Sequence, residues 1–372
     1  MSEISLILLA AGSSSRFGLG TKKQWLRTGD IPLWLFVAKR FESSHRFKEI
    51  IVVGEKNEIS YMSLFADYIF IEGGKERQDS LLNALNATTS KYVLTADVAR
   101  CCIDKDMIDR VISKIDEFDC IVPTLTAHDT TIFDSEYIDR NLVKLVQTPQ
   151  LSNKQKLISA LKNKKLFTDD SGAMREAGYS VGYVEGSKSA LKLTSKEDLE
   201  FIKCLTPPNS ANFCGIGFDT HQFDNQKQCV LGGVAIDGDG FKAHSDGDVL
   251  IHSIIDALLG AAGLGDIGEF FPDTDEAYKN ADSTVLLKRV LSLVRGVGFE
   301  INNVDVSVIA ERPRLSRYKN EIKINLAKIL QIPPYKLCIK ATTSEKMGYV
   351  GRGEGVAVLS TASLKFFDWT CV

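Results

Sequence analysis

Residues 4–18 read ISLILLAAGSSSRFG, an apolar run that opens into a turn rich in glycine and serine. An apolar run of this length bounded by a turn is typical of a buried β-strand. The small residues of the turn would let backbone N–H groups approach phosphate oxygens, and a helix N-terminus would add partial positive charge. Arg16 and Lys23 would bring the charge needed around a reacting phosphorus. The turn is neither a Walker loop nor a full dinucleotide fingerprint, so a surface turn without a ligand stays an alternative.

The segments that follow alternate between helical and strand patterns. We expect a helix at residues 33–41 and buried strands at residues 49–54, 92–96 and 120–123. Strands that alternate with helices predict an α/β domain of Rossmann-like type, with a mostly parallel sheet and helices on both faces. Ligands in such folds bind beyond the carboxyl ends of the strands, where the Gly/Ser-rich turn would lie.

The length of 372 residues predicts two domains. The sequence Thr206-Pro207-Pro208-Asn209-Ser210 disfavours a helix and lacks two backbone donors, so we expect a linker there and domains at residues 1–208 and 209–372. The second half predicts an α+β domain with a small sheet. Its expected strands are residues 212–218, 229–234, 302–309, 337–341 and 355–364, and its expected helices are residues 246–262, 283–296 and 314–330.

Composition and charge limit the kind of protein. A net charge of −3 argues against a general nucleic-acid binder or membrane-surface binder. The first residues do not resemble a signal peptide, and the most apolar stretch, residues 249–264, is too short to cross a bilayer. The 8 cysteines show no paired spacing, so we expect reduced thiols in a cytoplasmic protein, with Cys101 and Cys102 packing rather than doing redox chemistry.

A candidate metal site is formed by Asp219, His221 and His252. Asp219 and His221 are two apart at the end of an expected strand and therefore point to one side, and His252 follows on an expected helix. One carboxylate and two imidazoles with an open position are typical of a reactive zinc site, although the same set also binds iron in oxygenases. Asp248 and Asp256 share the helix face of His252, and Asp256 would orient an imidazole. The alternative is a core histidine without a metal.

A second polar cluster lies in Lys340-Ala341-Thr342-Thr343-Ser344-Glu345-Lys346. The three hydroxyl residues Thr342, Thr343 and Ser344 would donate to phosphate oxygens, and Glu345 would hold a second, hard cation. The alternative is a helix N-cap box, which uses the same residue types.

Several ordered motifs of the first half resemble 2-C-methyl-D-erythritol 4-phosphate cytidylyltransferase. They are residues 8–18, Lys23-Gln24, residues 73–80, Asp129-Thr130, Thr148-Pro149-Gln150, Thr168-Asp169-Asp170 and residues 184–192. The resemblance implies that CTP is the substrate and Mg²⁺ a cofactor. It implies that Ala10, Ala11, Gly12 and Ser80 hold the nucleotide, Arg16 and Lys23 stabilise the reacting phosphate, Asp97 contacts Mg²⁺, and Arg140 and Lys192 grip the second substrate.

One departure from that family lies at residues 96–101, where the usual sequence His-Asp-Ala-Ala-Arg-Pro is replaced. This chain has Ala96-Asp97-Val98-Ala99-Arg100-Cys101. Cys101 in the place of proline loosens a backbone constraint. The substitution is interpreted as divergence, not loss of activity.

Motifs of the second half closely resemble 2-C-methyl-D-erythritol 2,4-cyclodiphosphate synthase. They are residues 244–248 with His252, Gly265-Asp266-Ile267-Gly268, residues 271–275, residues 341–346 and residues 351–355. The resemblance implies Zn²⁺ (or Mn²⁺) on Asp219, His221 and His252, Mg²⁺ on Glu345, and a homotrimer with sites between subunits. It further implies that His244 and Thr343 stabilise the transition state, that Tyr349 and Arg352 lie near a central channel, and that the substrate is bound by Ser245, Asp266, Ile267, Gly268, Phe271, Asp273, Asp275, Ala310, Leu315, Thr342 and Ser344. Arg314-Leu315 stands where that family often has Lys-Met.

Together the two resemblances imply two non-consecutive steps of the non-mevalonate isoprenoid pathway on small phosphate substrates. The kinase step between them has no candidate sequence here, so association with a separate kinase is a hypothesis. Two other hypotheses stay open: a sugar-nucleotide pyrophosphorylase joined to a metal hydrolase, and an inactive metal-dependent trimer scaffold in the second half.

Overall fold

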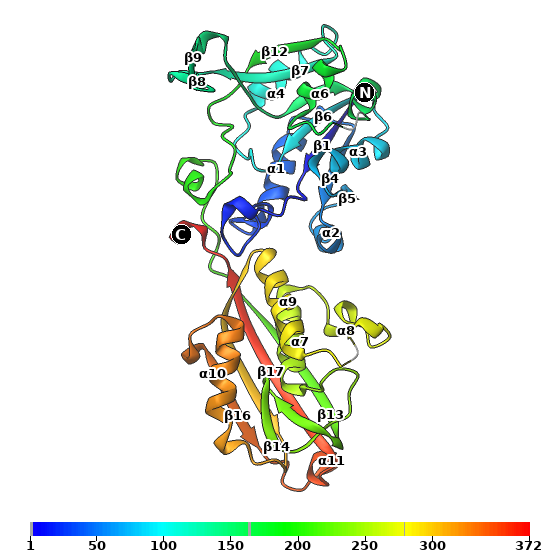
Figure 1. Cartoon of the computed structure of the whole chain (residues 1–372), viewed down its shortest axis with the longest axis vertical. Coiled ribbons are helices and arrows are strands. Elements are labelled where there is room, and N and C mark those ends of the chain that lie inside the picture. The colour runs from blue at the N-terminus through cyan, green and yellow to red at the C-terminus, as the bar shows by residue number, and fades with distance from the viewer. Residues whose placement is uncertain (1–2, 163–164, 279) are drawn as a thin grey trace. The chain divides into compact units, whose positions relative to one another are not determined.

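The computed structural model describes residues 3–162, 165–278 and 280–372. The chain divides into two compact units, Met1–Pro208 with Asp368–Val372, and Asn209–Phe367 (Figure 1). The last five residues were expected in the second domain, but they pack with the first unit. The reason is Trp369, which is buried and donates its indole N–H to Arg27 O at 2.6 Å.

The first unit is built on an eight-stranded sheet with the order β10-β7-β11-β6-β1-β4-β5, and β12 pairs with β7. β1 pairs in parallel with β4 and β6, β4 with β5, and β12 with β7, whereas β11 and β10 run antiparallel to their neighbours. The prediction of a mostly parallel sheet is confirmed. The strands are β1 Ile4–Leu9, β4 Glu49–Gly54, β5 Ile69–Glu72, β6 Tyr92–Asp97, β7 Cys120–Thr126, β10 Lys144–Val146, β11 Gln150–Asn153 and β12 Val181–Glu185.

Helices and short hairpins complete the first unit. Leu6, Ile7 and Leu8 of β1 are all fully buried, because the central strand is covered on both faces. The helices are α1 Leu33–Glu42, α2 Lys56–Met62, α3 Arg77–Ala87, α4 Lys105–Ile112, α5 Lys154–Leu161 and α6 Asp170–Glu176. The hairpins pair β2 Arg27–Thr28 with β3 Ile31–Pro32 and β8 Thr131–Phe133 with β9 Glu136–Ile138, and 3-10 turns cover Ser15–Phe17, Lys23–Trp25, Arg140–Leu142, Lys196–Phe201 and Trp369–Cys371.

The second unit has a five-stranded sheet with the order β14-β13-β17-β15-β16. The strands are β13 Asn212–Leu231, β14 Val234–Phe241, β15 Phe299–Ile309, β16 Leu337–Thr342 and β17 Gly355–Phe366. The helices are α7 Val249–Ala262, α8 Ile267–Phe270, α9 Ser283–Gly296, α10 Lys319–Leu330 and α11 Gly348–Gly351, with 3-10 turns at Glu276–Tyr278, Leu315–Arg317 and Pro334–Lys336.

Two expected elements of the second unit have different bounds. The expected strands 212–218 and 229–234 are largely one strand, β13, which turns at Gly232-Gly233 into β14. Both glycines have positive φ, 62° and 71°, which only glycine adopts freely. The range 229–234, expected to be one strand, therefore contains the end of β13, this turn and the start of β14. The expected helix at 314–330 begins at Lys319 after a 3-10 turn.

Helix α7 lies against β13 and β17 in the second unit (Figure 1). Gly215 and Gly217 of β13 make this approach close: a Cβ at Gly217 would lie 1.9 Å from Ser253 O, and one at Gly215 would lie 2.2 Å from Ala257 O. The two glycines share a strand face with Asp219 and His221. The helix that they admit therefore brings His252 to those two side chains.

A disulfide between Cys102 and Cys204 corrects the expectation that all cysteines are reduced. Their Cα atoms are 5.5 Å apart although 102 positions separate them in the chain. That distance lies in the usual range for a disulfide, and only the fold brings the two residues together. Cys101 is buried and free, with its Sγ 4.0 Å from Cys204 Sγ. No helix in the described part of the chain is long and apolar enough to cross a membrane.

Candidate functional sites

The first unit has a cavity of about 430 Å³ at the carboxyl ends of β1 and β6. Its wall includes the turn of residues 9–16 and the side chains of Lys23, Ser80, Asp97 and Lys192. The structure thus brings together eight of the predicted residues, which are Ala10, Ala11, Gly12, Arg16, Lys23, Ser80, Asp97 and Lys192. This is the position that an α/β fold offers to a ligand.

The segment that packs next to the Gly/Ser-rich turn depends on Gly73 and Gly74. A Cβ at Gly73 would lie 2.6 Å from Ala11 Cβ, and one at Gly74 would lie 2.2 Å from Asp79 Cβ. Ser80 holds this segment, because its hydroxyl accepts from Gly74 N at 3.0 Å and donates to Glu76 O at 3.1 Å. Ser80 therefore shapes the wall as well as facing the cavity.

Asp97 is the acidic group of this cavity. Its carboxylate accepts from Lys192 Nζ at 2.7 Å and lies 3.5 Å from Arg77 Nε. Burial by itself would raise the pKa of Asp97, but Arg77 and Lys192 outweigh it and hold the pKa below its usual value. Asp97 is therefore an ionised carboxylate in the wall, paired with the lysine predicted to bind the second substrate.

Lys23 lies in the wall of the cavity beside two other cations, Arg16 and Lys192. Burial lowers the pKa of Lys23, and the charges of Arg16 and Lys192 lower it further. Its Nζ donates to Leu193 O at 3.1 Å. Three cations that face one another without full compensation favour an anionic ligand such as a polyphosphate.

Arg140 does not join Lys192 in this cavity, contrary to the sequence prediction. It is exposed, and its guanidinium donates to His128 O at 2.7 Å beside the β8–β9 hairpin. The departure at residues 96–101 has a structural counterpart: Val98 lines the cavity, and Cys101 is buried next to the disulfide.

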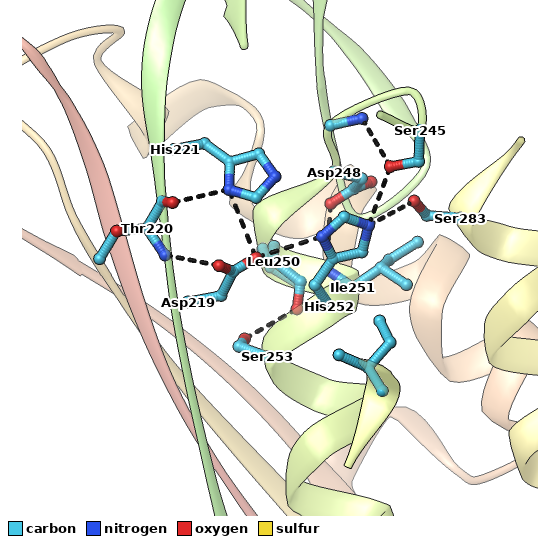
Figure 2. A network of polar contacts seen from close by, with 12 residues as sticks. Asp219, Thr220, His221, Ser245, Asp248, Leu250, Ile251, His252, Ser253 and Ser283 are labelled. Carbon is cyan, nitrogen blue, oxygen red and sulfur yellow. Dashed lines mark hydrogen bonds and ion pairs between the residues drawn. The ribbon is translucent and has the colours of Figure 1, made fainter. Parts of the chain in front are cut away.

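The second unit brings Asp219, His221 and His252 together, with one ligand atom from each within 4.8 Å of the others. Asp219 Oδ2 lies 3.1 Å from His252 Nδ1 and 3.4 Å from His221 Nδ1 (Figure 2). Burial would raise the pKa of Asp219, but both imidazoles outweigh it and lower the pKa well below its usual range. Burial would lower the pKa of His221, but Asp219 outweighs it and raises the pKa.

The donor set fits a divalent cation of the zinc class. His221 Nδ1 lies 2.8 Å from the carbonyl oxygen of Thr220, which only accepts, so its proton belongs on Nδ1 and Nε2 keeps a lone pair. Each imidazole can thus offer a nitrogen beside the Asp219 carboxylate. Two imidazoles and one carboxylate match the protein ligands of catalytic zinc, which keeps its fourth position for water or substrate.

The two aspartates predicted to share the helix face of His252 bond to backbone groups instead. Asp248 is buried and caps α7, and it accepts from Gly232 N and Gly233 N at 2.9 and 2.6 Å. Burial raises the pKa of Asp248 to about 6. Asp256 accepts from Ile267 N at 2.8 Å and so orients the loop before α8 rather than an imidazole, which corrects the prediction.

Sequence reasoning missed Ser283, which contacts His252 Nε2 at 3.0 Å from the start of α9. The predicted Ser245 contacts the same nitrogen at 3.2 Å. A serine after an aspartate at an expected helix start carries only the signal of a helix cap. Its position beside a metal ligand depends on how α9 packs on α7.

The loop after β16 has the conformation of a constrained turn. Glu345 and Lys346 have positive φ, 53° and 63°, and Thr343 donates its hydroxyl to Glu345 Oε1 at 2.7 Å. Glu311 Oε1 accepts from Ser344 N at 3.2 Å and from Lys346 N at 3.1 Å. The N-cap alternative is not what forms here, because the helix that follows, α11, begins at Gly348 with Met347 as its cap.

The other predicted residues of the second unit occupy several segments. His244 Nε2 lies 3.4 Å from Asp275 O, and Asp266 caps α8. Leu315 is buried in a 3-10 turn. The exposed or half-exposed residues among the predictions are Ile267, Gly268, Phe271, Asp273, Ala310, Thr342, Tyr349 and Arg352, and Arg352 pairs with Glu354 at 2.6 Å.

The triad and the loop after β16 lie at the same end of the sheet but on different strands. Thr220 pairs with Ala357, Ala357 with Ile309, and Ile309 with Thr342. Three strand spacings of about 4.8 Å separate Thr220 from Thr342 by about 14 Å. Within one chain, the strand row of the triad and the start of this loop are thus at opposite sides of a three-strand interval.

Comparisons with known proteins match both units. A family model described as 2-C-methyl-D-erythritol 4-phosphate cytidylyltransferase matches residues 4–205, and one described as the YgbB family matches residues 213–365. The bifunctional enzyme IspD/IspF of Campylobacter curvus is 50% identical over 100% of both chains. That of Sulfurimonas denitrificans is 51% identical over 99% of this chain and 95% of its own.

A solved structure matches the whole chain as well. The structure of the bifunctional IspDF from Campylobacter jejuni has a TM-score of 0.91 and 48% identity, covering 99% of this chain and 100% of its own. The likeness therefore extends across both units.

Proposed function

The chain belongs to the family of bifunctional IspD/IspF enzymes, and from that premise we propose which of its residues carry the two activities. The first is transfer of CMP from CTP to 2-C-methyl-D-erythritol 4-phosphate, with release of pyrophosphate. The second is closure of 4-diphosphocytidyl-2-C-methyl-D-erythritol 2-phosphate to the 2,4-cyclodiphosphate, with release of CMP.

The first reaction is assigned to the cavity at the ends of β1 and β6. The backbone of residues 10–12 would receive the triphosphate, because small side chains leave its N–H groups accessible. Arg16 and Lys23 face the same space and would stabilise the charge that builds on the α-phosphate and the leaving pyrophosphate. Asp97 would hold Mg²⁺, and Lys192 would bind the phosphate of the acceptor. Arg140 has no role in the cavity of its own chain.

The second reaction is assigned to the triad of Asp219, His221 and His252. The observation that carries this assignment is the meeting of three ligand atoms within 4.8 Å on the face of β13 that α7 covers. A zinc-class ion there would polarise a phosphate oxygen and bring the attacking and accepting phosphates together. Glu345 would hold Mg²⁺ and Thr343 would donate to the diphosphate, while His244 would stabilise the transition state.

Assembly into a trimer is part of the proposal for the second unit. The separation of about 14 Å between the triad row and the loop after β16 favours a site completed by another copy. The sheet face opposite α7 exposes Ile216, Phe218 and Leu359 at 70%, 57% and 40%. An apolar face of this kind is typical of a surface covered by a partner, here a second copy of the chain. Tyr349 and Arg352 would lie near the contact between copies.

The chemistry requires a separate enzyme between the two steps. The product of the first reaction lacks the 2-phosphate that attacks in the second, so a kinase must add it. Incubation of the protein with CTP, Mg²⁺ and methylerythritol phosphate should therefore release pyrophosphate but form no cyclodiphosphate. Cyclodiphosphate formed without a kinase would contradict the proposal.

Metal removal separates the two assignments. After a chelator has removed the metals, we expect Zn²⁺ or Mn²⁺ to restore CMP release from the phosphorylated intermediate. Mg²⁺ without Zn²⁺ or Mn²⁺ should be enough to restore pyrophosphate release from CTP. Among CTP, ATP, GTP and UTP, only CTP should turn over with methylerythritol phosphate. CMP release that survives metal removal would contradict the metal assignment.

A further inference from the structure

The nitrogen of His252 that faces away from Asp219 has two hydroxyl neighbours. His252 Nε2 lies 3.0 Å from Ser283 Oγ and 3.2 Å from Ser245 Oγ, whereas Nδ1 lies 3.1 Å from Asp219 Oδ2 (Figure 2). In a neutral imidazole one nitrogen carries the proton and the other offers a lone pair. The directions of these hydrogen bonds therefore decide which nitrogen is free to bind a metal.

The direction of the Ser283 hydroxyl is fixed by Asp246. Ser283 Oγ donates to Asp246 Oδ1, and Ser283 N donates to Asp246 Oδ2 at 3.0 Å. Asp246 Oδ1 also accepts from Asp248 N at 3.1 Å, which holds the carboxylate in place. The hydroxyl proton of Ser283 therefore points at Asp246. Ser283 Oγ can then only accept from His252 Nε2.

Ser245 does not impose a direction in the same way. Its Oγ accepts from Gly247 N at 3.2 Å, and its contacts among the described residues include no carboxylate. The Ser245 hydroxyl can therefore either donate to His252 Nε2 or accept from it. The chain of hydrogen bonds that sets the proton runs from His252 through Ser283 to Asp246.

We propose that Ser283 and Asp246 are positioning residues that hold the proton of His252 on Nε2 and so keep the Nδ1 lone pair at the metal centre. This inference rests on the proposed metal centre. Ser283 is fully buried, so water does not replace its hydroxyl. Outer hydrogen bonds of this kind fix the orientation and tautomer of metal-bound histidines.

Loss of the Ser283 hydroxyl would favour the wrong tautomer. Without it, Ser245 can donate to His252 Nε2, and a proton on Nδ1 can bind Asp219 Oδ2, 3.1 Å away. All polar groups are then satisfied, but Nδ1 has no lone pair for a metal. Metal binding then requires the proton to move from Nδ1 to Nε2, and the free energy of this step lowers the metal affinity.

The test compares Ser283→Ala with Ser253→Ala in the full-length chain. Ser253 is a matched control, because it is fully buried on α7 next to His252 but bonds to Leu250 O at 2.9 Å and Ser360 Oγ at 2.6 Å. Zn²⁺ affinity is measured by competition with a chromophoric chelator. Ser283→Ala should weaken it about 10- to 100-fold, the usual range for such neighbours. Ser253→Ala should stay within about twofold, and Ser283→Thr should recover most of the affinity.

A second readout is independent of activity and of metal. In metal-free protein labelled with ¹⁵N-histidine, Nε2 of His252 should carry a proton in the wild type, whether or not Nδ1 also donates to Asp219, and Nδ1 alone should carry it in Ser283→Ala. A wild-type Nε2 without a proton, or equal zinc affinities of the two alanine variants, would overturn the proposal. A wild type that binds no zinc would overturn the proposed metal centre instead. If Ser283→Ala failed to fold, the protonation of His252 Nε2 in the wild type would still test the role of Ser283.

Discussion

Gly217→Ala should separate α7 from β13 and weaken both the second unit and its metal centre. The new Cβ would lie 1.9 Å from Ser253 O and 2.7 Å from Ala257 N, whereas real Cβ contacts essentially never fall below 3.0 Å. Both obstacles are backbone atoms, so the helix must move by about 1 Å. Overpacking of this kind costs about 1–3 kcal/mol. For a unit of this size, that cost corresponds to a fall in melting temperature of about 2–12 °C.

The same shift moves His252 relative to Asp219. Metal–ligand distances tolerate changes of only about 0.2 Å, so a displacement of about 1 Å should weaken Zn²⁺ binding at least tenfold. The assay follows thermal unfolding with and without Zn²⁺, because the transition that rises with Zn²⁺ belongs to the second unit.

Gly260→Ala is the matched control on the same helix. A Cβ at Gly260 would have no atom within 4 Å, so the substitution should stabilise α7 by about 0.5–1 kcal/mol through helix propensity. Equal melting temperatures and zinc affinities for the two variants would refute the argument that Gly217 sets the distance between α7 and β13.

Three further predictions concern other features. Peptide mapping without reductant should yield a linked pair containing Cys102 and Cys204, and reduction should add two hydrogens; free thiols at both positions in oxidised protein would count against the link. In metal-free protein, the raised pKa of His221 adds stability that is fully present below pH 6.5 and is lost as the pH rises through the raised pKa, whereas the stability from the lowered pKa of Asp219 is lost only in strong acid. His221→Asn should therefore flatten the fall in melting temperature between pH 6 and 8. An unchanged slope would show that the ion pair of Asp219 and His221 does not cause this fall. Glu311→Leu should lower CMP release about tenfold or more by freeing the loop of residues 343–346, whereas Glu311→Gln keeps an acceptor and most of the activity; equal losses would show that charge, not loop geometry, matters.

The sequence was sufficient for features that depend on local spacing. The apolar run and small-residue turn at residues 4–18 predicted both the central strand and the cavity beyond it. The two-residue spacing of Asp219 and His221 predicted that they share a strand face. The Gly232-Gly233 turn also carried a recognisable hairpin signal, which the expected strand at 229–234 overlooked.

Features that depend on contacts between distant segments could not be read from the sequence. Ser283 meets His252 only because α9 packs on α7, and Cys102 meets Cys204 across 102 positions. The expected role of Asp256 failed because a backbone N–H, which no side-chain pattern reveals, takes its carboxylate. Trp369 joins the first unit through a contact with Arg27, 342 positions away.

The measurement that tests the central account most directly compares the two activities in one variant, His252→Asn. Pyrophosphate release from CTP and methylerythritol phosphate reports the first unit, and CMP release from the phosphorylated intermediate reports the second. We predict that CMP release falls at least a hundredfold, because a ligand of the metal centre is lost, while pyrophosphate release stays at the wild-type rate. CMP release near the wild-type rate, or a parallel loss of both activities in a folded protein, would contradict the assignment of the two reactions to separate sites.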